Sequence, residues 1–157
     1  MSIQQVCVIY VTRSTARGRQ VLLGHKRTGL GAGKVVAPGG KLEPGEHAAD
    51  AVLRELREEV GEQVACSDVV EVGINRYRFP TKPAWHQDSH VFTANWTAGE
   101  PEASDELQPE WVDTARVPYD LMWADARLWL PTVLDGGECC AEYTFAADLS
   151  SLDATRA

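Results

Sequence analysis

The sequence has 157 residues, of which 44% are hydrophobic and 24% are charged, and this length and composition are typical of one soluble globular domain. Its net charge of −8 argues against a nucleic-acid polymer as the main partner, because such complexes need a basic surface, but it does not exclude a nucleotide bound with metal ions. No apolar run approaches the roughly 20 residues that span a bilayer, and the N-terminus lacks the features of a signal peptide, so we expect a cytoplasmic protein that binds no membrane.

Hydrophobic runs and alternating patterns predict a series of strands along the chain. They cover residues 6–11, 20–24, 69–79, 90–96, 110–112 and 141–146, with a short extended piece at 34–37. The first two strands flank a polar loop at 13–19 and suit a hairpin. Glycines, prolines and polar residues predict further loops at 25–33, 80–88 and 99–109.

Two helices are predicted, far apart in the sequence. The first runs from about His47 to Val60 and is ended by Gly61. The second lies within residues 118–134, where Pro131 is expected only near the helix start. Strands mixed with separated helices favour α/β/α layers on a mixed sheet. We expect one domain over residues 1–157, with a core from about 4 to 147 and a frayed C-terminal tail.

The first predicted helix carries one apolar and one acidic face. At about 100° per residue, Val52, Leu56 and Val60 fall within roughly 60° of Ala49. On the same wheel, between roughly 180° and 280°, lie the four glutamates at positions 55, 58, 59 and 62. Like charges packed in this way destabilise a helix. A hard cation such as Mg²⁺ would remove the conflict, whereas the alternative is an ordinary solvated acidic face.

The residues around this helix form a long pattern with fixed spacing. Its fixed positions are, in order, Gly40, Glu46, Arg54, Glu55, Leu56, Glu58, Glu59 and Gly61. This pattern resembles the signature of the Nudix hydrolases, and every fixed position from Gly40 through Gly61 matches. The one departure is Glu62, where the family usually has an aliphatic residue, and Val64 offers that contact instead.

The resemblance implies an α/β protein with the Nudix α/β/α sandwich, in which a mixed β-sheet lies between helices. It also implies hydrolysis of a phosphoanhydride with one to three Mg²⁺ ions, or Mn²⁺ in their place. Such a reaction needs neutralised charge and a positioned water more than a protein nucleophile. The family assigns Glu58 and Glu59 as principal metal ligands, with Glu55 and the Gly40 carbonyl as further ligands.

Three acidic or basic residues near the signature receive other roles from the resemblance. Arg54 is expected to orient a neighbouring glutamate. Glu46, at the start of the helix, is expected to act as a cap, because a negative charge suits that end of the helix dipole. The general base stays open: Glu58 or Glu59 is the first candidate. Glu106 is the second candidate, and in this family a glutamate from that region also approaches the metals.

Further segments are similar to the MutT homologues that hydrolyse oxidised purine nucleoside triphosphates to the monophosphate and pyrophosphate. They are residues 21–27, 31–34, 90–92, 104–106 and 122–125. The favoured substrate is therefore 8-oxo-dGTP. The alternatives are pyrimidine triphosphates, nucleoside-diphosphate derivatives, or a binding module without turnover, although a pure binder has no need of the complete glutamate set. We expect a monomer that takes a small-molecule nucleotide.

The expected base pocket both keeps and loses features of those relatives. Trp123 keeps a stacking surface, Tyr77 keeps a ring and Asp125 keeps a carboxylate, while Lys26 and Lys41 are candidates for contacts to the triphosphate.

The chain lacks two polar groups and one aromatic ring that line the base pocket of those relatives. Val36 stands where the relatives use an asparagine to read the base edge, and Leu30 stands where they have an aromatic residue. Ala126 stands where they have a second aspartate. Discrimination between bases rests on buried polar groups, so these changes leave the preferred base open.

Overall fold

The computed structural model describes residues 3–156. Its strands are β1 (Gln4–Thr15), β2 (Gly18–Lys26), β3 (Val35–Val36), β4 (Gly39–Lys41), β5 (Ala65–Arg78), β6 (Gln87–Ala98), β7 (Leu107–Asp113), β8 (Glu142–Phe145) and β9 (Leu152–Arg156). Its α-helices are α1 (Ala48–Val60) and α2 (Ala126–Leu134), and single 3-10 turns lie at Pro83–Trp85, Thr114–Arg116 and Tyr119–Leu121.

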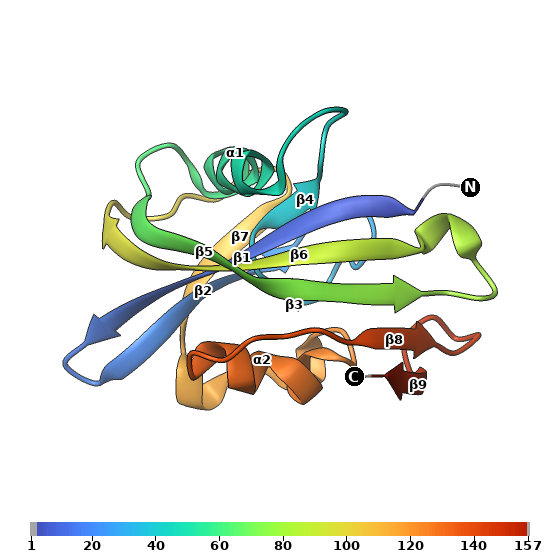
Figure 1. Ribbon diagram of the computed structural model, residues 1–157. Coiled ribbons are helices and arrows are strands. Elements are labelled where there is room, and N and C mark those ends of the chain that lie inside the picture. The colour runs from blue at the N-terminus through green and yellow to red at the C-terminus, as the bar shows by residue number, and fades with distance from the viewer. Residues whose placement is uncertain (1–2, 157) are drawn as a thin grey trace.

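All the strands described belong to one mixed sheet. Its order is β3-β2-β1-β6-β5-β8-β9, with β4 paired to β1 and β7 paired to β2. The β1–β6 and β5–β8 pairs are parallel, and the other pairs are antiparallel. Helix α1 covers one face and α2 the other (Figure 1). The predicted α/β/α layering on a mixed sheet is confirmed.

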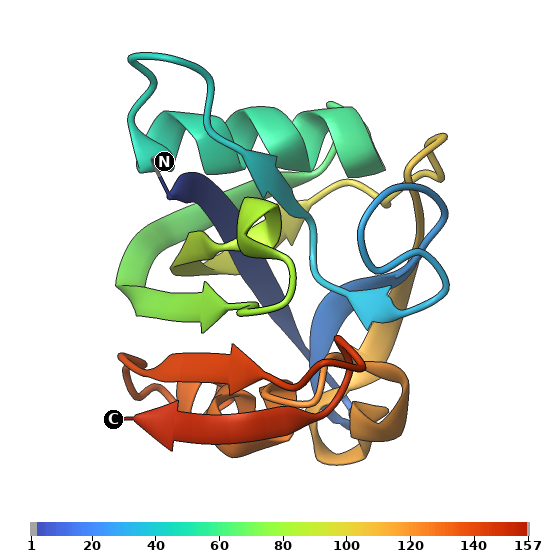
Figure 2. The same ribbon diagram turned by 90° about the vertical axis from the view of Figure 1, so that its right-hand side faces the viewer.

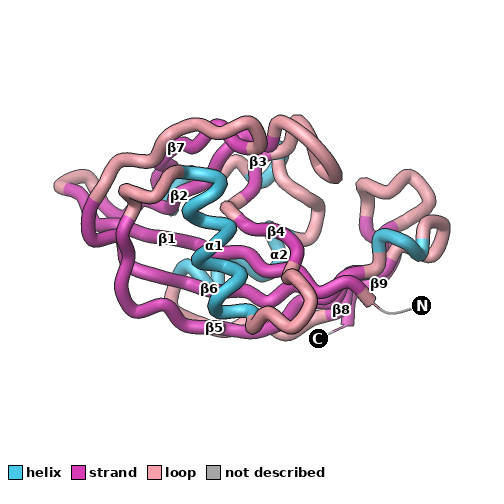
Figure 3. Tube along the Cα trace, turned by 90° about the horizontal axis from the view of Figure 1, so that it is seen from above, coloured by secondary structure: helices cyan, strands magenta, loops and turns pink. Residues whose placement is uncertain are grey.

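Strand β1 shows how the sheet divides the core in two. Successive side chains of a strand point to opposite faces, so Ile9 and Val11 pack under α1 while Val8 and Tyr10 pack toward α2. On the α1 side, the helix buries Val52, Leu56 and Val60 of the apolar stripe that the sequence predicts, whereas Ala49 at the helix start is exposed. Seen from above, α1 lies over the middle of the sheet (Figure 3). Its C-terminal residue is followed by Gly61, as expected.

The predicted loop at 13–19 is wrong for most of its length. Strand β1 continues to Thr15 and β2 begins at Gly18, so the hairpin closes with a tight turn. The Thr15 hydroxyl donates a 2.8 Å hydrogen bond to the carbonyl of Gly18 and fixes that turn. Polar side chains can occupy such strand ends, because both strands extend beyond the part of the sheet that the helices cover.

The prediction of a frayed C-terminal tail is also wrong where the structure describes it; Ala157 lies outside the described residues. Strand β9 pairs with β8 in antiparallel register, and both lie on the α2 side of the molecule (Figure 2). The carboxylate of Asp148 accepts the N–H groups of Ser150 and Ser151, each at 2.9 Å, and so builds the turn between the strands.

Helix α2 differs from expectation because Pro131 lies in its interior. A proline there leaves the carbonyl four residues earlier without its helical partner. The burial of Trp129, Leu130 and Val133 against the sheet compensates for this loss. None of the helices among residues 3–156 is both long and apolar enough to cross a membrane. All four cysteines are free thiols.

Candidate active site

Helix α1 places Glu55 and Glu59 one turn apart on the side that faces the sheet. Both side chains are buried, with 8% and 6% of their surface exposed. Glu58 and Glu62 are exposed. The expected single acidic face is therefore divided. Glu55 and Glu59, four residues apart, share the side that faces the sheet, whereas Glu58 is turned away from it and Glu62 lies beyond the helix end at Val60.

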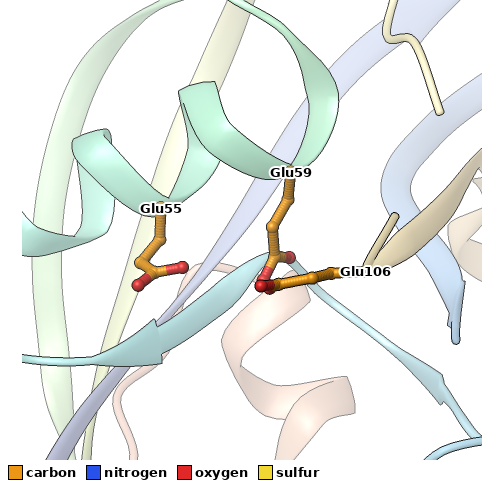
Figure 4. A group of neighbouring side chains, drawn as sticks. All are labelled: Glu55, Glu59 and Glu106. Carbon is orange, nitrogen blue, oxygen red and sulfur yellow. The ribbon is translucent and has the colours of Figure 1, made fainter. Parts of the chain in front are cut away.

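A third carboxylate joins this pair from a distant part of the chain. Oxygens of Glu55, Glu59 and Glu106 lie within 4.8 Å of one another, and the three side chains converge from α1 and from the loop before β7 (Figure 4). Arg27 fixes that loop. Its N–H donates to the carbonyl of Glu106 and its guanidinium to that of Ser104, both at 2.8 Å.

The three clustered carboxylates lie in an unfavourable electrostatic environment. Burial, and then the neighbouring Glu55, raise the pKa of Glu59 to about 8. Burial also raises the pKa of Glu55, against the lowering effect of Arg54. Hard divalent cations prefer carboxylate oxygens, and a bound cation would favour the ionised form of each acid. The set of donor atoms therefore fits the divalent metal that Nudix proteins generally use.

The structure brings only some of the expected metal ligands into the carboxylate cluster. Glu58 lies outside the three-carboxylate cluster, and its two carboxylate oxygens accept long hydrogen bonds of 3.4 Å from Arg54. Gly40 lies directly against the cluster: a Cβ atom at this position would come within 2.5 Å of the Glu55 carboxyl group. A larger residue here would displace the Glu55 carboxyl group. That its carbonyl binds metal stays a prediction.

Arg54 links the signature loop to the helix. Its guanidinium donates to both oxygens of Glu46, at 2.8 and 2.9 Å, and to Glu55 at 2.9 Å. It also donates to the carbonyl of Lys41 at 3.1 Å. The expectation that Arg54 orients a neighbouring glutamate agrees with this geometry.

Glu46 does not cap α1, contrary to expectation. The helix has no side-chain cap, and the Glu46 carboxylate instead accepts the N–H of Glu43 at 2.9 Å. Hydrogen bonds from Arg54, and then from the Glu43 N–H, lower the pKa of Glu46 to about 2. The reason is distance along the chain: Glu46 lies two residues before the helix and reaches the guanidinium on its second turn.

A cavity of about 620 Å³ opens beside the cluster and extends toward α2. It is lined by every residue that the sequence analysis proposes for the substrate, namely Lys26, Leu30, Val36, Lys41, Tyr77, Trp123 and Asp125. Gly40 and the four glutamates at 55, 58, 59 and 106 line it as well, whereas Arg54 does not. One continuous cavity therefore joins an acidic end to an aromatic end.

Asp125 forms the polar centre of the aromatic end. It is 2% exposed, and its Oδ2 accepts hydrogen bonds from the Tyr77 hydroxyl and the Trp129 indole N–H, both at 2.7 Å. Its Oδ1 is buried without a protein partner. Burial raises the pKa of this carboxyl group. The analysis of the sequence missed Trp129, although its spacing of four residues from Asp125 on a helix was an available signal.

Trp123 both packs against the core and lines the cavity. Its ring packs edge-on against Phe79 and Phe145, with centroids 6.3 and 5.6 Å away, yet it is only partly buried and lines the cavity. The ammonium of Lys34 lies 4.9 Å from its centroid. Phe79 and Trp85 extend this aromatic wall and were missed, because their loop carries no motif.

Sequence and structure comparisons agree with this combination of fold and site. The chain matches the NUDIX domain family over residues 1–133. It is 41% identical over 115 residues to the oxidized purine nucleoside triphosphate hydrolase of Danio rerio, covering 73% of this chain and 72% of that protein. It is 33% identical over 137 residues to the Mus musculus protein of the same name, covering 87% and 86%.

A solved structure extends the similarity to nearly the whole chain. The crystal structure of the mMutator MutT protein from Bacillus halodurans superimposes with a TM-score of 0.70 and 28% identity, covering 98% of this chain and 97% of that one. A mixed sheet between two helices, with the signature glutamates on the helix that covers one face, is the arrangement expected of the Nudix class. The chain belongs to the Nudix family.

Proposed function

We propose that this protein is a Mg²⁺-dependent pyrophosphohydrolase that converts 8-oxo-dGTP, or a related oxidised purine nucleoside triphosphate, to the monophosphate and pyrophosphate. The observation that carries the proposal is the continuous cavity, with the Glu55–Glu59–Glu106 cluster at one end and Trp123 and Asp125 at the other. The names of the fish and mouse relatives support the same substrate class.

The acidic end suits the triphosphate together with its metal. Glu55 and Glu59 would hold Mg²⁺, with Mn²⁺ as a substitute, and Glu106 is near enough to join them. When bound, the ion supplies charge neutralisation of the phosphates and acidification of a water molecule. Lys26 and Lys41 line the same cavity and would contact phosphate oxygens.

The remaining charged residues of the site would position the reacting groups. Arg54 holds Glu55 in place through its 2.9 Å hydrogen bond. Among the general-base candidates, we favour Glu106, because it is exposed at the cavity and its loop is fixed independently of α1. Glu58 already accepts hydrogen bonds from Arg54, which weakens its case.

The aromatic end would hold the base. Trp123 offers a face for stacking and Asp125 offers a hydrogen-bonding group, while Leu30 and Val36 add apolar lining. The protein would then remove damaged nucleotides before a polymerase uses them, acting as a cytoplasmic monomer on a small molecule.

The test is the identity of the products formed from 8-oxo-dGTP with Mg²⁺, separated by ion-exchange chromatography. We expect 8-oxo-dGMP and pyrophosphate, no turnover in EDTA, and a loss of at least about a hundredfold in kcat for Glu59→Gln. Glu62→Gln is the matched control, because that glutamate is exposed in the turn just after the same helix. Formation of 8-oxo-dGDP and phosphate, or full activity of Glu59→Gln, would refute the proposal.

A further inference from the structure

The side of β1 that faces α2 forms part of the cavity wall. Along this strand Val6, Val8 and Tyr10 alternate with residues that face α1, and all three line the cavity. Tyr10 is 4% exposed and packs edge-on against Trp129, with ring centroids 5.7 Å apart and an interplanar angle of 79°. Trp129 is the same residue whose indole N–H donates to Asp125. Tyr10 and Asp125 therefore border one indole at the aromatic end.

The Tyr10 hydroxyl is a polar group without a protein partner. Among residues 3–156 it makes no hydrogen bond, whereas the hydroxyl of Tyr77, which lines the same cavity, donates to Asp125. Nearby, Oδ1 of Asp125 is likewise unpartnered. Polar groups removed from water are costly unless they are hydrogen-bonded. Only Asp125 Oδ1 is a fully buried atom of this kind, whereas the Tyr10 hydroxyl keeps some accessible surface, and both residues line the cavity. A ligand in the cavity can therefore supply the hydrogen bonds that both groups lack.

The chemistry of the Tyr10 hydroxyl suits the edge of a nucleobase. A phenol can both donate and accept a hydrogen bond. Burial, and then the Asp125 carboxylate, raise the pKa of Tyr10, so the hydroxyl keeps its proton at neutral pH. The edge of a purine presents donors and acceptors side by side, and the side chain of Val36 can form a hydrogen bond with neither.

We propose that the Tyr10 hydroxyl hydrogen-bonds the edge of the nucleobase and is a specificity-determining residue, in place of the amide that is missing at Val36. This inference rests on the proposed function, because it requires that a nucleotide occupies the cavity with its base at the aromatic end. It does not require that the base is 8-oxoguanine.

The experiment compares wild type with Tyr10→Phe, which removes the hydroxyl and keeps the ring that packs on Trp129. Tyr143→Phe is the matched control: Tyr143 is equally buried in the same core but does not line the cavity. For each protein, kcat/KM is measured with 8-oxo-dGTP, dGTP, dATP and dCTP. Binding of 8-oxo-dGMP without metal is measured by tryptophan fluorescence, and the melting temperature is recorded.

We expect Tyr10→Phe to lower kcat/KM for the preferred nucleotide by about tenfold and to bring it closer to the values for the other bases. Binding of the monophosphate should weaken to a similar extent, while Tyr143→Phe behaves as wild type. A loss of the same size with every base, or in both variants, would overturn the inference in favour of a structural role. So would a wild-type preference that Tyr10→Phe retains in full.

The result for wild type separates this inference from the proposed function. If wild type prefers a base other than 8-oxoguanine and Tyr10→Phe loses that preference, the inference stands and the proposed substrate falls. If wild type hydrolyses all four nucleotides equally, no residue reads the base and the inference is overturned as well.

Discussion

The guanidinium of Arg54 holds the carboxylate of Glu46 through two hydrogen bonds of 2.8 and 2.9 Å. This pair ties the loop before α1 to the helix, because Glu46 also accepts the N–H of Glu43. The same guanidinium donates to Glu55 within the acidic cluster. The position of one cluster carboxylate therefore depends on an ion pair that does not itself line the cavity.

Replacing Arg54 by alanine should disturb the cluster without removing a carboxylate. We expect Arg54→Ala to lower kcat by at least about tenfold and to weaken the apparent affinity for Mg²⁺, because Glu55 loses its 2.9 Å partner. Arg57→Ala is the control, since Arg57 is exposed on the same helix. The measurement is kcat as a function of Mg²⁺ concentration. Equal curves for the two variants would contradict the positioning role of Arg54.

Mg²⁺ should stabilise the folded protein. A cation that binds only the folded state raises the free energy of unfolding as its concentration exceeds its dissociation constant. We expect the melting temperature to rise with Mg²⁺ in wild type and in Glu62→Gln, but much less in Glu59→Gln. Differential scanning calorimetry checks this. A rise of equal size in all three proteins would show that the ion binds elsewhere.

The buried Glu59 predicts how stability without metal depends on pH. Its folded-state pKa of about 8 lies above the ordinary value of 4.5, so the folded protein binds this proton more tightly than the unfolded chain does. The resulting destabilisation is absent below about pH 4.5 and grows until about pH 8, where it reaches a few kcal/mol. In metal-free buffer, Glu59→Gln should therefore gain stability relative to wild type across this range.

Urea unfolding of both proteins at several pH values measures this difference. If the difference in the free energy of unfolding between the two proteins stays constant with pH, Glu59 has an ordinary pKa and the prediction is wrong. Addition of Mg²⁺ should reduce this difference near pH 8, because a cation beside the carboxylate favours its ionised form.

The assignment of the general base can be tested by neighbouring substitutions. We expect Glu106→Gln to lower kcat by at least about a hundredfold, as is usual for loss of a general base. Asp105→Asn is the control, because that carboxylate is exposed and lies outside the cluster. Both variants are measured at one pH and at saturating Mg²⁺. Full activity of Glu106→Gln would return the role to Glu58 or Glu59.

Several features of the molecule could be predicted from sequence because local patterns determine them. The length of α1, its apolar stripe and its end at Gly61 follow from periodicity and a glycine stop. The family signature also identified the glutamates of α1, and the structure brings two of them, Glu55 and Glu59, together with Glu106 from a distant loop.

Other features depend on contacts between distant segments, which a single sequence does not show. The division of the glutamates into buried and exposed pairs depends on the rotation of α1 over Gly40. The use of Glu46 as a partner of Arg54 rather than a cap depends on the path of the loop. The place of Tyr10 in the cavity could not be predicted, because it depends on the packing of β1 against α2.

The most direct test is the ratio of kcat/KM for 8-oxo-dGTP to kcat/KM for dGTP, from initial rates of pyrophosphate release by wild type at saturating Mg²⁺. We predict a ratio of at least about ten, because the Asp125 carboxylate and the Trp123 ring line the end of the cavity that we propose holds the base. A ratio near one, or a higher value for dGTP, would contradict a role in removing oxidised purine nucleotides.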